Sequence, residues 1–177
     1  MTEKTVFTGF GGQGIISLGQ IWVFSAMQEG KNITFFPFYG AEKRGGVARA
    51  SVIVSDNEIA SPLVTQPDSA LVMNRDSLPI CEGILKRNGL LLINSSLVSE
   101  DSRRTDAKIV KIEAAGIAER IGSIRFANMV ALGAMAKLTG ALSLDNIEEI
   151  LRQFFPPDKH HFISKNVQAI EAGAKAV

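Results

Sequence analysis

A glycine-rich turn between an apolar strand and an apolar-faced helix is the feature that most limits how this chain can fold. Residues 6–10 (VFTGF) have the composition of a buried strand, and Gly11-Gly12-Gln13-Gly14 follows at once. From Ile15 onward, apolar residues recur at helical spacing up to Gly30, a natural helix end. Residues 33–38 form a second apolar strand. We therefore predict a Rossmann-like first β-α-β unit, with parallel strands and a right-handed crossover.

The rest of the chain predicts more strands and then helices alone. Residues 50–54 and 58–60 are expected to form a hairpin with its turn at residues 55–57. Further strands are expected at residues 70–74, 90–94 and 108–113. A helix capped by Asp76 is expected to end near residue 88, and a helix capped by Ser143 is expected at 144–155. Further helices are expected at 114–121, 127–138 and 163–177. This order predicts a single three-layer α/β/α domain over residues 1–177. Its sheet should be mostly parallel, and mixed because of the hairpin.

The glycine turn permits three interpretations. Residues 9–14 satisfy G-x-G-x-x-G, and such glycines let a dinucleotide pyrophosphate approach a helix N-terminus. That fingerprint also needs a carboxylate about 20 residues further on, whereas residues 32–38 contain no acid and the next one is Glu42. The glycines could instead serve only a tight turn and close packing. In the third interpretation, their backbone amides contact an anion or a coenzyme phosphate. A P-loop is excluded, because no Lys-Ser or Lys-Thr pair follows.

Composition and the cysteine count exclude other classes of function. The net charge of +1 gives no overall attraction to nucleic acid. Residues 1–5 carry no apolar leader core, and no apolar run is long enough to span a bilayer, so we expect a cytoplasmic protein without a membrane partner. A single cysteine, Cys81, cannot form an internal disulfide or a cysteine-based zinc or iron–sulfur site. It lies within the apolar residues 78–85, which favours a place in the core.

Two motifs together resemble a family pattern more specific than the dinucleotide fingerprint. Residues 10–15 (FGGQGI), followed by residues 39–46 (YGAEKRGG), are similar to the gamma subunit of the 2-oxoacid:ferredoxin oxidoreductases, which act on pyruvate, 2-oxoglutarate or 2-ketoisovalerate. The second motif of that family is Tyr-Gly-x-Glu-x-Arg-Gly-Gly, and every fixed member is present here. Residues 59–62 (IASP), 72–74 (VMN) and 128–134 (NMVALGA) extend the resemblance over nearly the whole chain.

The resemblance implies an accessory role in a larger enzyme. In that family the complex oxidatively decarboxylates a 2-oxoacid, passes the acyl group to coenzyme A and sends electrons through iron–sulfur clusters to ferredoxin. Thiamine diphosphate, magnesium and the clusters are then expected in partner alpha, beta and ferredoxin-like delta subunits. This chain is expected to bind no cofactor or metal alone and to be inactive alone. A contribution to the coenzyme A region is a further expectation.

The same two motifs supply the candidate site residues. The candidate contacts for coenzyme A, another anion or a partner are Gly11, Gly12, Gln13, Gly14, Lys43 and Arg44, and the candidate interface residues are Tyr39, Glu42, Arg44 and Arg49. An arginine fork suits bidentate contact with a carboxylate or phosphate. The alternatives are an ion pair between Glu42 and Arg44 inside the loop, and Tyr39 at the edge of the core. Because both motifs follow strands of one parallel unit, both should lie at the carboxyl edge of the sheet.

No catalytic residue and no metal ligand is predicted. His160 and His161 are expected at the surface, and Arg103 and Arg104 in a solvated loop. Two rival functions stay open at this point. One is a stand-alone nucleotide-binding or regulatory module that uses the glycine turn. The other is a dehydrogenase, for which neither a ribose-binding acid nor a proton donor is visible.

Overall fold

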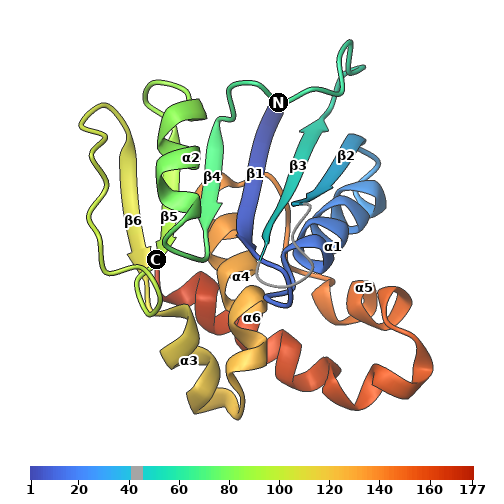
Figure 1. Ribbon diagram of the computed structural model, residues 1–177. Helices are drawn as coiled ribbons and strands as arrows, with labels where there is room; N and C mark the ends of the chain where they lie inside the picture. Colours follow the sequence, from blue (N-terminus) through green and yellow to red (C-terminus); the bar gives the residue numbers. More distant parts are fainter. Residues whose placement is uncertain (41–45) are drawn as a thin grey trace.

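The computed structural model describes residues 1–40 and 46–177, which form a six-stranded mixed sheet covered by helices on both faces (Figure 1). The strands are β1 (Thr2–Phe10), β2 (Asn32–Tyr39), β3 (Val47–Ser55), β4 (Ser69–Val72), β5 (Leu90–Asn94) and β6 (Lys108–Ile112). The α-helices are α1 (Ile15–Gln28), α2 (Ser77–Ile84), α3 (Ala114–Ile121), α4 (Ala127–Thr139), α5 (Ile147–Phe154) and α6 (Ile163–Lys175). Two 3₁₀ helices, η1 (Ile124–Phe126) and η2 (Pro157–Phe162), precede α4 and α6.

The strand order is β2-β3-β1-β4-β5-β6, and β3 alone runs against the others. The predicted mixed sheet is therefore confirmed. The predicted hairpin partner was wrong, because residues 58–60 form no strand and β3 instead pairs with β2. As a result β1 and β2 run in the same direction but are not neighbours. β3 forms hydrogen bonds along nearly its whole length to β1 on one side and to β2 on the other. A three-residue strand at residues 58–60 would pair with only a third of β3, so β2 is the more favourable neighbour.

The sheet separates two apolar clusters of unequal size. The larger lies between the sheet and α1, α3, α4, α5 and α6, with Trp22 of α1 edge-on to Phe7 of β1 at 5.3 Å between ring centroids. The smaller lies between the sheet and α2, and it contains Leu78 and Cys81. The predicted three-layer α/β/α architecture is confirmed, with a single helix in one of its outer layers. Cys81 is fully buried, as predicted.

Two glycines allow α4 and α6 to pack backbone against backbone. A Cβ atom at Gly133 of α4 would overlap the carbonyl of Ile170, and one at Gly173 of α6 would overlap the carbonyl of Val130. Each helix therefore has a glycine at the point where the other helix's main chain passes.

Several predicted helix boundaries are wrong. Asp76 precedes α2, but its side chain does not cap the helix; the Asn74 Oδ1 atom accepts the Ser77 N–H at 3.2 Å instead. Helix α2 ends at Ile84, before the predicted end near residue 88. Helix α5 begins three residues later than predicted, because the Ser143 hydroxyl accepts the Asp145 N–H in a preceding turn. Along the described residues, no helix is both long and apolar enough to cross a membrane.

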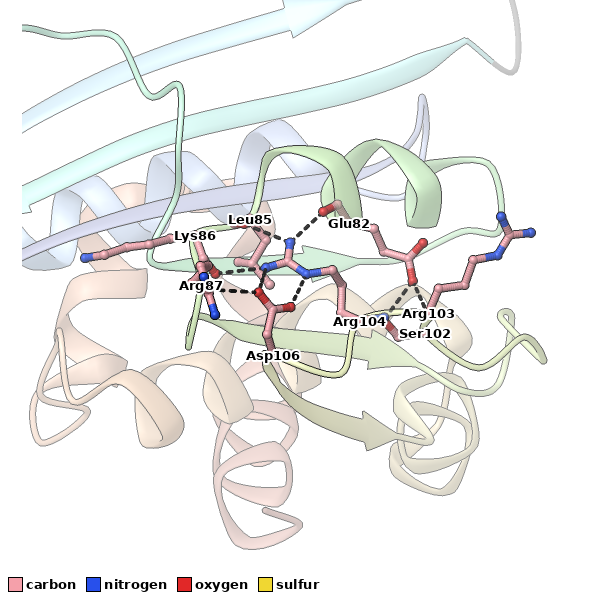
Figure 2. Close-up of polar contacts among 8 residues, drawn as sticks. All are labelled: Glu82, Leu85, Lys86, Arg87, Ser102, Arg103, Arg104 and Asp106. Atoms are coloured by element: carbon pink, nitrogen blue, oxygen red, sulfur yellow. Dashed lines mark hydrogen bonds and ion pairs between the residues drawn. The ribbon is translucent and has the colours of Figure 1, made fainter.

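Arg104 was predicted to be a solvated loop residue, and this was wrong: its side chain makes several structural hydrogen bonds (Figure 2). Its guanidinium donates to the carbonyls of Glu82 and Leu85 at 2.6 and 2.8 Å, and more weakly to that of Lys86. The same guanidinium pairs with both carboxylate oxygens of Asp106, at 2.6 and 3.1 Å. Because α2 ends early, its last carbonyls lack helical partners, and Arg104 supplies the missing donors.

Candidate functional site

The two glycine motifs meet at the carboxyl edge of the sheet, the edge at which β1, β4, β5 and β6 end. Phe10, the last residue of β1, lies opposite Val47, the first residue of β3. The Gly11 N–H donates to the Gly46 carbonyl at 3.1 Å, and the Gly40 N–H donates to the Val47 carbonyl at 2.9 Å. The predicted co-location of the motifs is therefore confirmed for the described parts of both. We call this region the glycine edge, defined by residues 11–14, Gly40 and Gly46.

Three predicted site residues fall on residues 41–45, outside the described part of the chain. They are Glu42, Lys43 and Arg44. Their predicted contacts with coenzyme A or a partner, and the alternative Glu42–Arg44 ion pair, stay predictions.

The Gln13 side chain holds the glycine edge together. Its Oε1 atom accepts the Phe10 N–H at 2.6 Å, and its Nε2 atom donates to the Met73 carbonyl at 3.2 Å. These bonds join the turn after β1 to the end of β4. The sheet grows outward in both directions from β1 and β4, and such a division is where α/β sheets place ligands. The Gln13 side chain therefore fixes the turn after β1 against the end of β4.

Gly12 and Gly14 have backbone conformations that favour glycine. Their φ angles are +95° and +74°, in the region that L side chains rarely adopt. A Cβ at Gly14 would also overlap the side chain of Asn128, the second residue of α4, whereas nothing lies within 4 Å of one at Gly12. Gly12 is exposed, and α1 has no side-chain cap at its N-terminus. A bare helix N-terminus beside an exposed glycine is suited to bind an anion.

Asn128 connects this turn to the helices beneath the sheet. Its Nδ2 atom donates to the Gly14 carbonyl at 3.4 Å, and its Oδ1 atom accepts the Met129 N–H at 3.0 Å. The sequence places Asn128 only in the late-helix motif, and nothing in its spacing indicates this contact across the fold. The FGGQG and NMVALGA motifs therefore meet at one point.

The two candidate interface residues within the described chain lie on the β2–β3 hairpin. Tyr39 ends β2 and is 64% exposed, so it does not lie at the edge of the core. Arg49 of β3 is half-buried, with its guanidinium carbon 5.6 Å from the ring centroid of Phe38. Phe36 and Phe38 of β2 are each about half exposed, at 51% and 48%. The hairpin thus presents aromatic side chains and one arginine next to the glycine edge.

Neither the cysteine nor the histidines are arranged for catalysis. Burial raises the pKa of the Cys81 thiol to about 11, and the thiol lies 3.3 Å from the Thr8 hydroxyl. His160 bonds through Nε2 to the Phe155 carbonyl at 2.9 Å, and His161 is exposed. In residues 1–40 and 46–177, no three His, Cys, Asp or Glu side chains are grouped to hold a metal ion.

Known proteins are similar to this chain in both sequence and fold. Residues 4–176 match the family described as pyruvate ferredoxin/flavodoxin oxidoreductase. The chain is 35% identical to 2-oxoglutarate synthase subunit KorC of Methanothermobacter thermautotrophicus, over 96% of this chain and 92% of KorC. It is 31% identical to the pyruvate/ketoisovalerate oxidoreductases common subunit gamma of Thermococcus kodakarensis, over 84% of each. It is 34% identical to ketoisovalerate oxidoreductase subunit VorA of Methanothermobacter marburgensis, but it spans only 36% of VorA.

Two solved structures resemble this one closely. The keto/oxoacid ferredoxin oxidoreductase gamma subunit from Geobacter sulfurreducens has a TM-score of 0.83 at 29% identity, covering 98% of this chain and 97% of its own. The 2-oxoglutarate:ferredoxin oxidoreductase from Magnetococcus marinus has a TM-score of 0.89 at 23% identity, over 99% of this chain and 31% of its own, and shows a shared fold. The motifs at the glycine edge, the match over residues 4–176 and the near-complete coverage of gamma subunits show that this chain belongs to the pyruvate ferredoxin/flavodoxin oxidoreductase family, as one of its gamma-type subunits.

Proposed function

We propose that this chain assembles with alpha, beta and ferredoxin-like delta subunits, and that it contributes backbone contacts to coenzyme A without catalysing a step itself. The complex would oxidise a 2-oxoacid to an acyl-coenzyme A and reduce ferredoxin. Thiamine diphosphate, magnesium and iron–sulfur clusters would belong to the partners. The likeness to gamma subunits supports this division of labour. A cytoplasmic location stays a prediction.

The observation that carries the coenzyme A assignment is the bond between Gly11 and Gly46, which brings both motifs to one edge. There the exposed Gly12 and the bare N-terminus of α1 suit a phosphate. Lys43 and Arg44 are proposed to add positive charge. The Magnetococcus marinus relative was solved with 2-oxoglutarate, coenzyme A and succinyl-CoA bound, which supports coenzyme A as the anion.

Co-expression tests the assembly. The tagged chain, produced together with the alpha, beta and delta subunits, should co-purify with them as a complex that contains iron–sulfur clusters and thiamine diphosphate. Iron and thiamine analysis of the complex would check this. If the chain elutes alone under those conditions, the proposed function is wrong.

A pair of glycine variants tests the coenzyme A contact. Gly12→Ala places a methyl group in the open space where the phosphate would approach, and should raise the KM of the complex for coenzyme A about fivefold or more with little change in kcat. Gly30→Ala is the matched control, because Gly30 also flanks α1, has a φ of +72° and has nothing within 4 Å of its Cβ position. The two variants should therefore lose similar amounts of stability, on the order of 1 kcal/mol. Equal KM values for coenzyme A would remove the assignment.

Arg44→Ala gives a second test of the same edge. It should leave the melting temperature of the chain nearly unchanged and either weaken assembly or raise the KM for coenzyme A. An unfolded variant would make the second motif a structural element, and a variant without either effect would make the assignment of Arg44 wrong.

A further inference from the structure

A cavity of about 630 Å³ opens beside the glycine edge, between the N-terminal ends of α1, α4 and α6. Its walls come from η1, η2 and the first turns of these helices, with Phe155 after α5. Asn128, which bonds to Gly14, is one of the lining residues. The cavity and the glycine edge therefore share a wall. We call this cavity the basic pocket.

The floor of the basic pocket is aromatic. Phe126, Phe155 and Phe162 line it, together with the buried Met129. Phe126 and Phe162 meet edge to face, with 6.5 Å between ring centroids, yet Phe162 remains 45% exposed. Neighbouring Ile124 is 50% exposed. An aromatic surface left open in this way is typical of the anchor region of a protein interface.

The rim of the basic pocket carries positive charge. Arg125, Lys159 and Lys165 line it, and no acidic side chain does so among the described residues. Lys165 already donates to the Ile121 carbonyl at 2.5 Å, whereas no ion pair to Arg125 or Lys159 is found within the described chain. Because the net charge of the whole chain is only +1, this is a local concentration of cations.

We propose that the basic pocket receives an acidic segment of a partner subunit, which inserts an aromatic or large aliphatic side chain onto the phenylalanine floor. Its carboxylates would pair with Arg125 and Lys159 at the rim, where the arginine fork allows bidentate contact. Charge complementarity selects an acidic segment over a neutral one, and the apolar floor selects a segment with a bulky side chain over a free inorganic anion. The inference rests on the proposed function, since it requires partner subunits, and it adds a second contact beside the coenzyme A region.

Photo-crosslinking identifies the occupant directly. Phe162→p-benzoylphenylalanine, placed in the chain within the co-purified complex, should crosslink under near-ultraviolet light to one partner segment. Mass spectrometry of that segment should find several Asp or Glu residues around an aromatic or large aliphatic residue. A crosslink to a neutral or basic segment, a crosslink to a second copy of this chain, or the absence of any protein crosslink would each overturn the proposal.

Charge reversal then tests the rim. Arg125→Glu combined with Lys159→Glu should lower the yield of co-purified complex at least tenfold at low salt. The matched control is Lys108→Glu combined with Lys137→Glu, which makes the same charge change at two exposed lysines away from the pocket and should assemble normally. Circular dichroism of the free variants should match that of the unmodified chain. Normal assembly of the pocket variant would contradict the inference.

The outcomes distinguish a failure of the proposed function from a failure of the inference alone. An unmodified chain that does not co-purify contradicts the proposed function, and the inference then falls with it. An unmodified chain that assembles, beside a pocket variant that assembles equally well, contradicts only the inference. Any complex recovered with the pocket variant should keep the unmodified KM for coenzyme A, whereas Gly12→Ala should change that KM without reducing assembly.

Discussion

At the scale of single residues, Arg104 does the most to complete the structure around α2. Five hydrogen bonds from one guanidinium satisfy three main-chain carbonyls and a carboxylate. The accepting carbonyls lie 18 to 22 residues earlier in the chain, so no local pattern in the sequence indicates them. Cys81, by contrast, is predictable, because the apolar residues around it in the sequence already place it in the core.

Replacing Arg104 should destabilise the chain. Arg104→Met keeps much of the apolar stem but removes all five hydrogen bonds, and should cost about 2 kcal/mol, or about 4–8 °C in melting temperature for a chain of this length. The control is Arg103→Ala, which removes an exposed neighbouring arginine whose side chain makes no ion pair with any residue in the described part of the chain. Thermal unfolding at neutral pH measures both. Similar melting temperatures for the two variants would show that Arg104 is dispensable.

The same pair should give a pH dependence of defined sign. The hydrogen bond from Arg104 lowers the pKa of Asp106 below its ordinary value of 3.8. The contribution of the pair is therefore fully present above pH 3.8 and is lost as the pH falls through the lowered pKa of the folded state. The difference in stability between the unmodified chain and Arg104→Met should be constant near neutral pH and narrow in acid. Denaturant unfolding at a series of pH values measures it, and a difference that widens in acid would contradict the assignment.

At the scale of elements, every observed strand was predicted, but a predicted strand at residues 58–60 is absent and the neighbours of β3 were not all foreseen. The apolar residues 6–10 and 90–94 lie in central strands, because a run of such residues needs burial on both faces. Residues 33–38 also lie in a strand, but β2 is at the edge of the sheet and leaves Phe36 and Phe38 about half exposed. The pairing of β3 with both β1 and β2 could not be predicted, since the residues of a strand do not specify which strands lie beside it. The positions of Tyr39 and Arg49 on one hairpin follow from the pairing of β2 with β3.

The close contact between α4 and α6 should make the chain sensitive to a larger residue at Gly133. Gly133→Ala forces a methyl group into the Ile170 carbonyl and pushes the two helices apart. It should lower the free energy of unfolding by about 3 kcal/mol. Gly83→Ala is the control, because Gly83 is exposed in α2 and nothing lies within 4 Å of its Cβ position. That change should be neutral or stabilising by up to about 1 kcal/mol, since alanine favours helix. Equal denaturation midpoints would show that α4 and α6 can move apart freely.

At the scale of the whole molecule, the sequence supports the family and the layers more firmly than the site. The two glycine motifs and their spacing identified the family, and the order of strands and helices predicted three layers. The basic pocket could not be predicted, because Arg125 lies far from Lys159 and Lys165 in the sequence and meets them only when η1 packs beside η2 and α6. The single-domain organisation of residues 1–177 stays a prediction.

The isolated chain should be colourless, metal-free and inactive. One cysteine cannot hold an iron–sulfur cluster, and that cysteine is buried. Visible absorption and metal analysis of the purified chain test the first two properties. An assay of 2-oxoacid oxidation with ferredoxin or a viologen dye tests the third. Activity should appear only after the partner subunits are added, and a reproducible iron content or turnover by the pure chain would contradict the accessory role.

The position of β1 has a consequence for synthesis on the ribosome. Of the six strands it is made first, yet its two neighbours in the sheet are β3 and β4. Thr2 therefore has no partner until Ser55 is made, and Thr5 has none on its other side until Ser69 is made. At about 5–20 residues per second, the apolar β1 leaves the exit tunnel seconds before it has a partner. The nascent chain must keep this strand from other chains during that interval. Chaperone demand should therefore be concentrated early in translation, before β4 emerges.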